Sequence, residues 1–178
     1  MTPVRVAICA VVVALLVGSL LTSSVWSQAQ FDNPSLLVDG LVGQPRRFTR
    51  DDLTALRPWS MPVVFAAGQQ VQSATFTGPP LLDVINAAGG PAFDPSRNND
   101  LLRRFIVATA ADGYAVVLAW GEIDPEFGAE PVLVAFERDE RPLGDDQGLA
   151  RLVVPGDKRG GRHVNRLVHI EIRDLGTP

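Results

Sequence analysis

The stretch "RRFIVATAADGYAVVLAW", Arg103 to Trp120, predicts a chain rich in β-structure. Two apolar runs with many β-branched residues lie on either side of Ala111-Asp112-Gly113. An Asp-Gly pair between two such runs is the strongest short-range indication of a β-hairpin. The stretch therefore predicts two antiparallel strands joined by a tight turn.

The sequence on both sides of this hairpin predicts further short strands. Strand-like runs occur in "SLLVDGLV", in "MPVVFAAGQQVQSATF" around a turn at Gly68-Gln69, and in "PVLVAFERDERPLG", "ARLVVP" and "RLVHIEIRDL". No strand–helix–strand repeat with crossovers of helix length occurs. The pattern predicts a mixed fold dominated by β-structure rather than a doubly wound sheet.

Two short helices are expected between these strands. Thr49 has the position of an N-cap, and the acidic pair Asp51-Asp52 would lie in the first turn of its helix. Pro79-Pro80 opens the second predicted helix, which Gly89-Gly90 would end.

Residues 1–29 are interpreted as an export signal, and residues 30–178 as one domain. Arg5 comes before an apolar run from Val6 to Leu21, and Ser27-Gln28-Ala29 fits a signal-peptidase site. The run is shorter than the roughly 20 apolar residues of a bilayer span, so cleavage is favoured over an N-terminal membrane anchor. We therefore expect a periplasmic or secreted protein with no stable membrane span.

Composition limits the chemistry of the exported chain. Cys9, the one cysteine, lies in the predicted signal, so the mature domain would have no disulfide and no thiolate ligand. The formal net charge of −4 disfavours general binding to nucleic acid. The pattern also lacks a nucleophile elbow, a phosphate loop and a dinucleotide fingerprint.

The segment "LVVPGDKRGGRHVN", Leu152 to Asn165, concentrates basic residues in this acidic chain. Glycines allow close approach of the backbone, and free N–H groups together with Arg and Lys favour an anion. The alternative is a solvated hairpin loop whose charges prevent pairing between sheet edges. The cations concerned are Lys158, Arg159, Arg162 and Arg166.

Neither the histidines nor the acidic residues form a metal-binding pattern. His163 and His169 lack the i, i+4 spacing of a helical metal pair. His163 could contact an anion, whereas His169 is expected on the outward face of a strand. Glu122, Asp124 and Glu126 lack the glycine and closing glutamate of a calcium loop and are interpreted as a solvated acidic turn.

Five blocks of the sequence carry a resemblance to a known family. In this order, they resemble the sulfite-oxidase-type molybdopterin-binding domain, in particular short bacterial members described as molybdopterin-dependent oxidoreductases. The resemblance runs from about Leu36 to Asp174 and implies an α+β fold with mixed sheets. The blocks are "VDGLVGQPRRFTRDDLTAL", "FTGPPLLDVINAAGG", "ADGYAVVLAWGEIDPEF", "PVLVAFERDERPL" and "LARLVVPGDKRGGRHVNRLVHIEI".

The resemblance also implies a cofactor site. In members that carry molybdopterin, the segment after the "VPG" turn supplies backbone amides and basic side chains to the pterin and its phosphate. Asn165 stands where larger members often have a lysine. The cofactor-binding residues implied for this chain are Lys158, Arg159, Gly160, Gly161, Arg162, His163 and Asn165.

Two features depart from the catalytic members. Their molybdenum is bound by a cysteine that would fall near Ala66 or Ala67, and neither side chain can ligate a metal. Members exported with the cofactor use a twin-arginine signal, whereas the single Arg5 suggests export as an unfolded chain.

Two hypotheses follow. The first is an exported molybdopterin-binding, oxidoreductase-like domain that holds a phosphorylated pterin or similar anion through the Gly/Arg/Lys loop and has no metal-ligating cysteine. The second is a non-catalytic envelope module that kept the fold and lost the molybdenum centre. It would bind another small anion, or a protein partner through an exposed apolar patch around Trp59, Met61 and Phe65.

Overall fold

The computed structural model describes residues 34–127 and 131–176, so the predicted export signal lies outside the described residues. The strands are β1 Leu36–Gly40, β2 Arg46–Phe48, β3 Trp59–Ala67, β4 Gln70–Gly78, β5 Arg104–Ala110, β6 Ala115–Ala119, β7 Leu133–Ala135, β8 Glu137–Arg138, β9 Arg141–Pro142, β10 Arg151–Val153 and β11 Leu167–Asp174. The helices are α1 Arg50–Ala55 and α2 Leu81–Ala87, with 3-10 turns η1 Asp100–Arg103, η2 Trp120–Glu122, η3 Pro125–Phe127 and η4 Gly160–Arg162.

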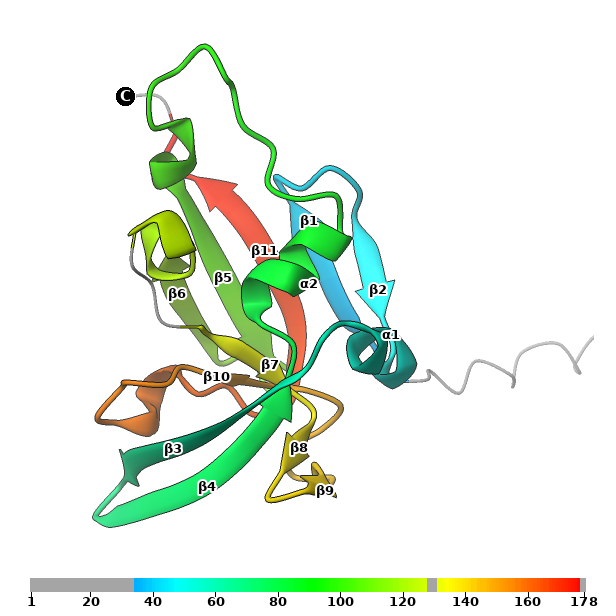
Figure 1. Ribbon diagram of the computed structural model, residues 1–178, viewed down its shortest axis with the longest axis vertical. Helices are drawn as coiled ribbons and strands as arrows, with labels where there is room; N and C mark the ends of the chain where they lie inside the picture. Colours follow the sequence, from blue (N-terminus) through cyan, green and yellow to red (C-terminus); the bar gives the residue numbers. More distant parts are fainter. Residues whose placement is uncertain (1–33, 128–130, 177–178) are drawn as a thin grey trace, which may run out of the picture. The chain divides into compact units, whose positions relative to one another are not determined.

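The strands of residues 34–176 form three sheets (Figure 1). The largest has the order β2-β1-β11-β5-β6, in which β1 and β11 are parallel and the other neighbours antiparallel. The others have the orders β3-β4-β8-β9 and β10-β7. The predicted hairpin is confirmed, since Val107 of β5 pairs with Val117 of β6. The α+β architecture with mixed sheets is confirmed as well.

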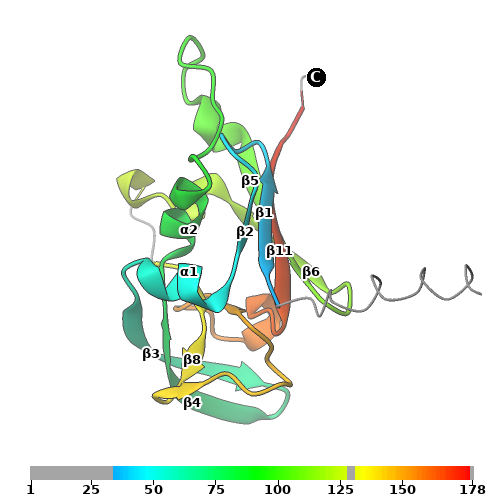
Figure 2. The ribbon, with the colours of Figure 1, turned by 90° about the vertical axis from the view of Figure 1, so that its right-hand side faces the viewer.

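Both predicted helices form, and they pack on one face of the five-stranded sheet (Figure 2). Thr49 caps α1 in a capping box, in which its hydroxyl accepts from the Asp52 N–H and the Asp52 carboxylate accepts from the Thr49 N–H. Strand alternation turns the fully buried side chains of the sheet toward these helices. The core residues concerned are Leu36, Val38, Leu53, Leu81, Ile85, Ile106 and Ile170.

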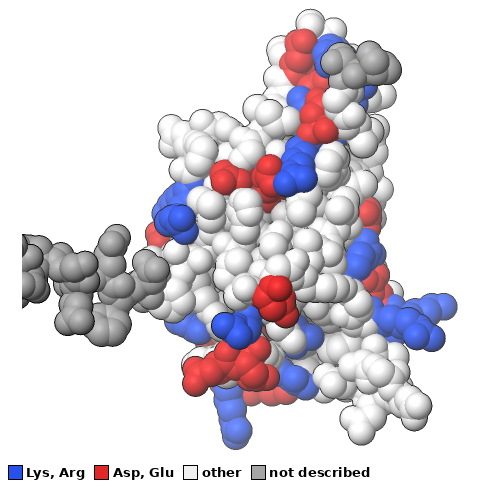
Figure 3. All heavy atoms as spheres, turned by 180° about the vertical axis from the view of Figure 1, so that it is seen from behind, with Lys and Arg blue, Asp and Glu red and all other residues white. Residues whose placement is uncertain are grey.

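The opposite face of the five-stranded sheet is seen from behind in Figure 3, where the middle of the surface is uncharged and Lys, Arg, Asp and Glu are intermixed around it. Val117 of β6 is 56% exposed, because it alternates with the buried Val116 and Leu118.

A second, smaller core joins the β3–β4 hairpin to β7 and β10. It contains Phe65, Phe76, Leu133 and Val153, all nearly or fully buried. The backbones of β4 and β7 come very close here, since a Cβ on Gly78 would lie 2.2 Å from the carbonyl oxygen of Val134. Only glycine permits this approach, which fixes the hairpin against β7.

Candidate anion-binding site

The basic loop, residues 156–165, connects β10 to β11 and lies beside the end of β3 (Figure 1). The Ala66 N–H donates to the Lys158 carbonyl at 2.9 Å, and Ala66 pairs with Arg159 in an isolated parallel bridge. Leu152 and Val164 exchange two backbone hydrogen bonds of 2.9 and 3.0 Å across the base of the loop. The place where the family's cysteine was expected therefore adjoins the basic loop, and the side chain there is alanine.

Arg162 is held by two carboxylates. Its Nε and Nη2 donate to the two oxygens of Asp157 at 2.9 and 2.7 Å, and Nη1 pairs with Glu122. The bidentate guanidinium lowers the pKa of the Asp157 carboxyl. Glu122 also accepts a hydrogen bond from the Ala119 N–H at 2.9 Å. The prediction of a solvated acidic turn did not include these two partners of Glu122, Arg162 and Ala119. Arg162 therefore braces the loop against η2.

Replacing Arg162 by alanine should cost stability. Since the guanidinium is about one-third exposed, solvent screening limits the expected loss to about 1 kcal/mol, or about 3 °C in melting temperature. Thermal unfolding of Arg162→Ala against wild type measures this. An unchanged melting temperature would show that the two ion pairs do not brace the loop.

Lys158 and Arg159 differ from Arg162 in having no carboxylate within 4 Å among the described residues. Both are exposed, as are Asn165 and Arg166 in the turn that leads into β11. The positive charges of Lys158 and Arg159, whose backbone adjoins Ala66 of β3, are therefore not neutralised by a carboxylate among the described residues.

The two glycines of the loop have different environments. Gly160 packs under Phe65, because an added Cβ would lie 2.8 Å from the Phe65 ring. Gly161 has open space at the same position, and its carbonyl accepts a hydrogen bond from the Tyr114 hydroxyl. The loop is thus anchored at Gly160 and open at Gly161.

His163 is buried inside the loop and not exposed with the cations. Its ring lies 4.4 Å from Phe65 between centroids, and Nε2 contacts the Val154 carbonyl at 3.1 Å. Nδ1 is buried and has no hydrogen-bond partner among the described residues. Burial lowers the pKa of His163, which keeps the imidazole neutral at physiological pH.

This lowered pKa makes stability depend on pH below the ordinary value of 6.5. Between that value and the folded-state pKa, His163 is protonated in the unfolded chain but not in the folded chain. The free energy of unfolding should therefore fall as pH decreases. Melting temperatures from pH 7.5 to 5 measure this slope. His163→Gln should flatten it and the control His169→Gln should not; equal slopes in wild type and His163→Gln would contradict the assignment.

Arg151 is a site residue that the sequence analysis missed. It is 6% exposed, and its guanidinium carbon lies 5.6 Å from the Phe65 ring centroid and 4.9 Å from that of Phe76. Nη1 donates to the Gln147 side chain at 3.0 Å, whereas Nε is buried and has no partner among the described residues. Burial lowers the pKa of Arg151 to about 10. The available signal was an arginine inside the apolar run "ARLVVP".

Comparison with known proteins identifies the family. A family model described as "Oxidoreductase molybdopterin binding domain" matches residues 24–176. The chain belongs to this family. A search of curated proteins found no match.

A solved member of this fold class is similar in structure. The crystal structure of the sulfane dehydrogenase SoxCD from Paracoccus pantotrophus matches with a TM-score of 0.64 and 20% sequence identity. The match covers 80% of this chain and 39% of the other, so the chain spans about two-fifths of that protein. The family fold expected from the resemblance is thereby confirmed.

The family's cofactor has a phosphate end and a metal end, and the residues of this site suit only the first. Arg151 Nε and His163 Nδ1 are buried without partners among the described residues, and both side chains lie beside Phe65, under which Gly160 of the basic loop packs. Such donors, beside a loop that also carries the exposed Lys158 and Arg159, suit a phosphorylated polar ligand. At the metal end, Ala66 and Ala67 provide no ligand. Among residues 34–127 and 131–176, no three His, Cys, Asp or Glu side chains gather into a possible metal site.

Two further predicted features are located by the structure. His169 is half-buried in β11, and its Nε2 lies 2.7 Å from Asp39 of β1, so it belongs to the five-stranded sheet and not to the loop. The predicted apolar patch is wrong for Phe65, which is 3% exposed because strand alternation turns it into the second core.

Within the described part of the chain, no helix has the length and apolar character to cross a membrane.

Proposed function

We propose that this domain binds a phosphorylated pterin of the molybdopterin class through Arg151 and the basic loop. The observation that supports this most is Arg151, a buried guanidinium with no carboxylate within 4 Å among the described residues. A buried charge is costly unless a partner neutralises it, and the guanidinium fork matches the oxygens of a phosphate.

The residues of the site divide the work. The buried Arg151 would bind the phosphate, and the exposed Lys158 and Arg159 would add positive charge. The backbone at Gly161 leaves room for close approach. Arg162, already paired with Asp157, holds the loop in shape rather than contacting the ligand.

The cofactor, when bound with its metal, supplies oxygen-atom or electron transfer. The chain contributes binding and orientation, because alanines stand where a thiolate ligand was expected at the end of β3. Any molybdenum in this site would depend on the dithiolene sulfurs of the pterin itself. We therefore propose a pterin-binding domain without a protein ligand to the metal.

The alternative is a non-catalytic module that uses the same cations for another phosphate-bearing anion. Both functions need a phosphate-binding site, so only the identity of the bound ligand distinguishes them. Isothermal titration of the purified chain with inorganic pyrophosphate tests the shared anion site, and saturable binding that weakens with salt is the expected result. Absence of binding up to millimolar concentrations would contradict both.

A further inference from the structure

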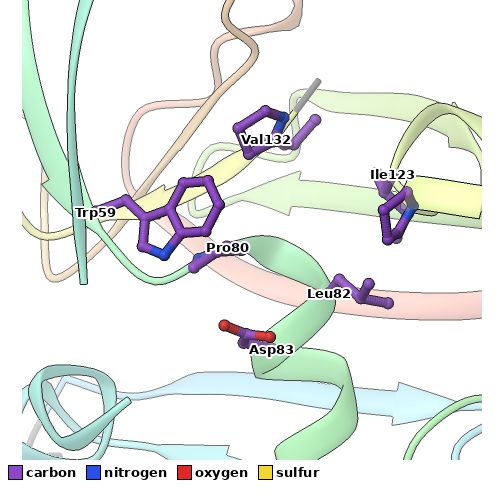
Figure 4. Close-up of a pocket in the computed structure, with 8 residues that line it drawn as sticks. Trp59, Pro80, Leu82, Asp83, Ile123 and Val132 are labelled. Atoms are coloured by element: carbon purple, nitrogen blue, oxygen red, sulfur yellow. The ribbon is translucent and has the colours of Figure 1, made fainter. Parts of the chain in front are cut away.

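A pocket of about 210 Å³ lies where the start of β3 meets the start of α2 (Figure 4). On the same measure a cavity needs roughly 10–15 Å³ to hold one water, so this space admits a small molecule. Its lining includes Trp59, Pro80, Leu82, Asp83, Ile123 and Val132. Trp59 and Ala66 stand seven residues apart on β3, a separation of about 23 Å in an extended strand, so this pocket is separate from the basic loop.

Asp83 is the charged group of the pocket. Figure 4 shows its side chain beside α2, below Pro80 and the Trp59 indole. The residue is half-buried, and its carboxylate has no ion pair and no hydrogen-bond donor among the described residues. Asp83 lies in the first turn of α2 and also lines an open hollow that includes Arg57, so the helix dipole and this arginine compensate part of its charge. On the side of the pocket its neighbours are mainly apolar, and the negative charge there favours a cation over an anion.

Trp59 provides an aromatic surface beside that carboxylate. Its cross-strand partner is Gly78, which has no side chain to cover the indole, and Trp59 is 49% exposed. The face of an indole attracts cations, most strongly those that carry apolar groups and are weakly hydrated. An aromatic face, an unpaired carboxylate and apolar walls therefore converge in one pocket.

From this arrangement we infer that the pocket is a second ligand site, which binds a small organic ammonium ion with an apolar body. The ammonium group would lie between the Trp59 indole and the Asp83 carboxylate, and the apolar body against Leu82, Ile123 and Val132. A neutral ligand would leave the carboxylate unpaired, and an anion would be repelled by it. The site does not depend on the pterin proposal.

Isothermal titration of the full chain with choline and with its uncharged isostere 3,3-dimethylbutan-1-ol tests this directly. We expect saturable choline binding and at least about tenfold weaker binding of the alcohol. Asp83→Asn and Trp59→Leu should each weaken choline binding by about tenfold. Equal affinity for the two compounds, or no choline binding up to millimolar concentrations, would overturn the assignment.

Two controls separate binding from folding. Asp51→Asn removes a comparable first-turn carboxylate from α1 and should leave choline affinity unchanged. Melting temperatures of all variants show whether each is folded at the temperature of titration. Pyrophosphate binding should persist in Asp83→Asn, so a failure of the ammonium site and a failure of the anion site would appear as different results.

Discussion

Arg151→Met should weaken anion binding strongly while leaving the ligand-free domain at least as stable as wild type. The guanidinium is buried against Phe65 and Phe76 without a carboxylate partner, so its charge disfavours the ligand-free fold. Methionine fills a similar space without that charge. Removing the buried cation should weaken pyrophosphate binding about 100-fold, which titration calorimetry measures.

The opposite pattern would identify Arg151 as purely structural. In that case Arg151→Met would lower the melting temperature and leave the affinity for pyrophosphate unchanged. Arg47→Met is the matched control, because Arg47 is exposed on β2 and has no ion pair among the described residues. It should change neither quantity beyond experimental error.

Gly78→Ala should have the largest effect on stability. The new Cβ would lie 2.2 Å from the Val134 carbonyl oxygen and 2.5 Å from the Ala135 Cα, and both belong to the backbone of β7. Backbone must therefore move at the junction between the hairpin and the second core. We expect a loss of about 3 kcal/mol or more, which lowers the melting temperature by about 6–12 °C.

Gly161→Ala is the control for that substitution. No atom lies within 4 Å of the added Cβ, and the position does not need a positive φ. Its stability should stay within about 0.5 kcal/mol of wild type. Similar losses for the two alanine variants in chemical denaturation would show that the close crossing at Gly78 does not limit stability.

The sequence predicted the elements that depend on local chemistry. The β5–β6 hairpin follows from its Asp-Gly turn, and α1 from the capping residue Thr49. The parallel pairing of β1 with β11 was not predictable, because it joins the two ends of the domain through tertiary packing. The inward direction of Phe65 likewise depends on where β7 and β10 pack against the hairpin.

The same distinction applies to the site. The cluster of charges in "GDKRGGR" located the basic loop. It did not indicate which of the cations in the loop are paired with carboxylates and which are not. The pairing of Arg162 with Glu122 joins residues 40 positions apart, and no spacing rule indicates it. Arg151 was missed because its importance comes from burial, which only the packed structure reveals.

Pterin content tests the proposed function most directly. Residues 30–178, without the predicted export signal, would be produced so that the domain folds in the cytoplasm of a host that makes molybdopterin. Pterin fluorescence would be measured after oxidation, and molybdenum would be counted by elemental analysis. The predicted result is close to one pterin per chain in wild type and almost none in Arg151→Met. A folded wild-type sample that contains no pterin would contradict the assignment of Arg151 and the basic loop as a pterin site.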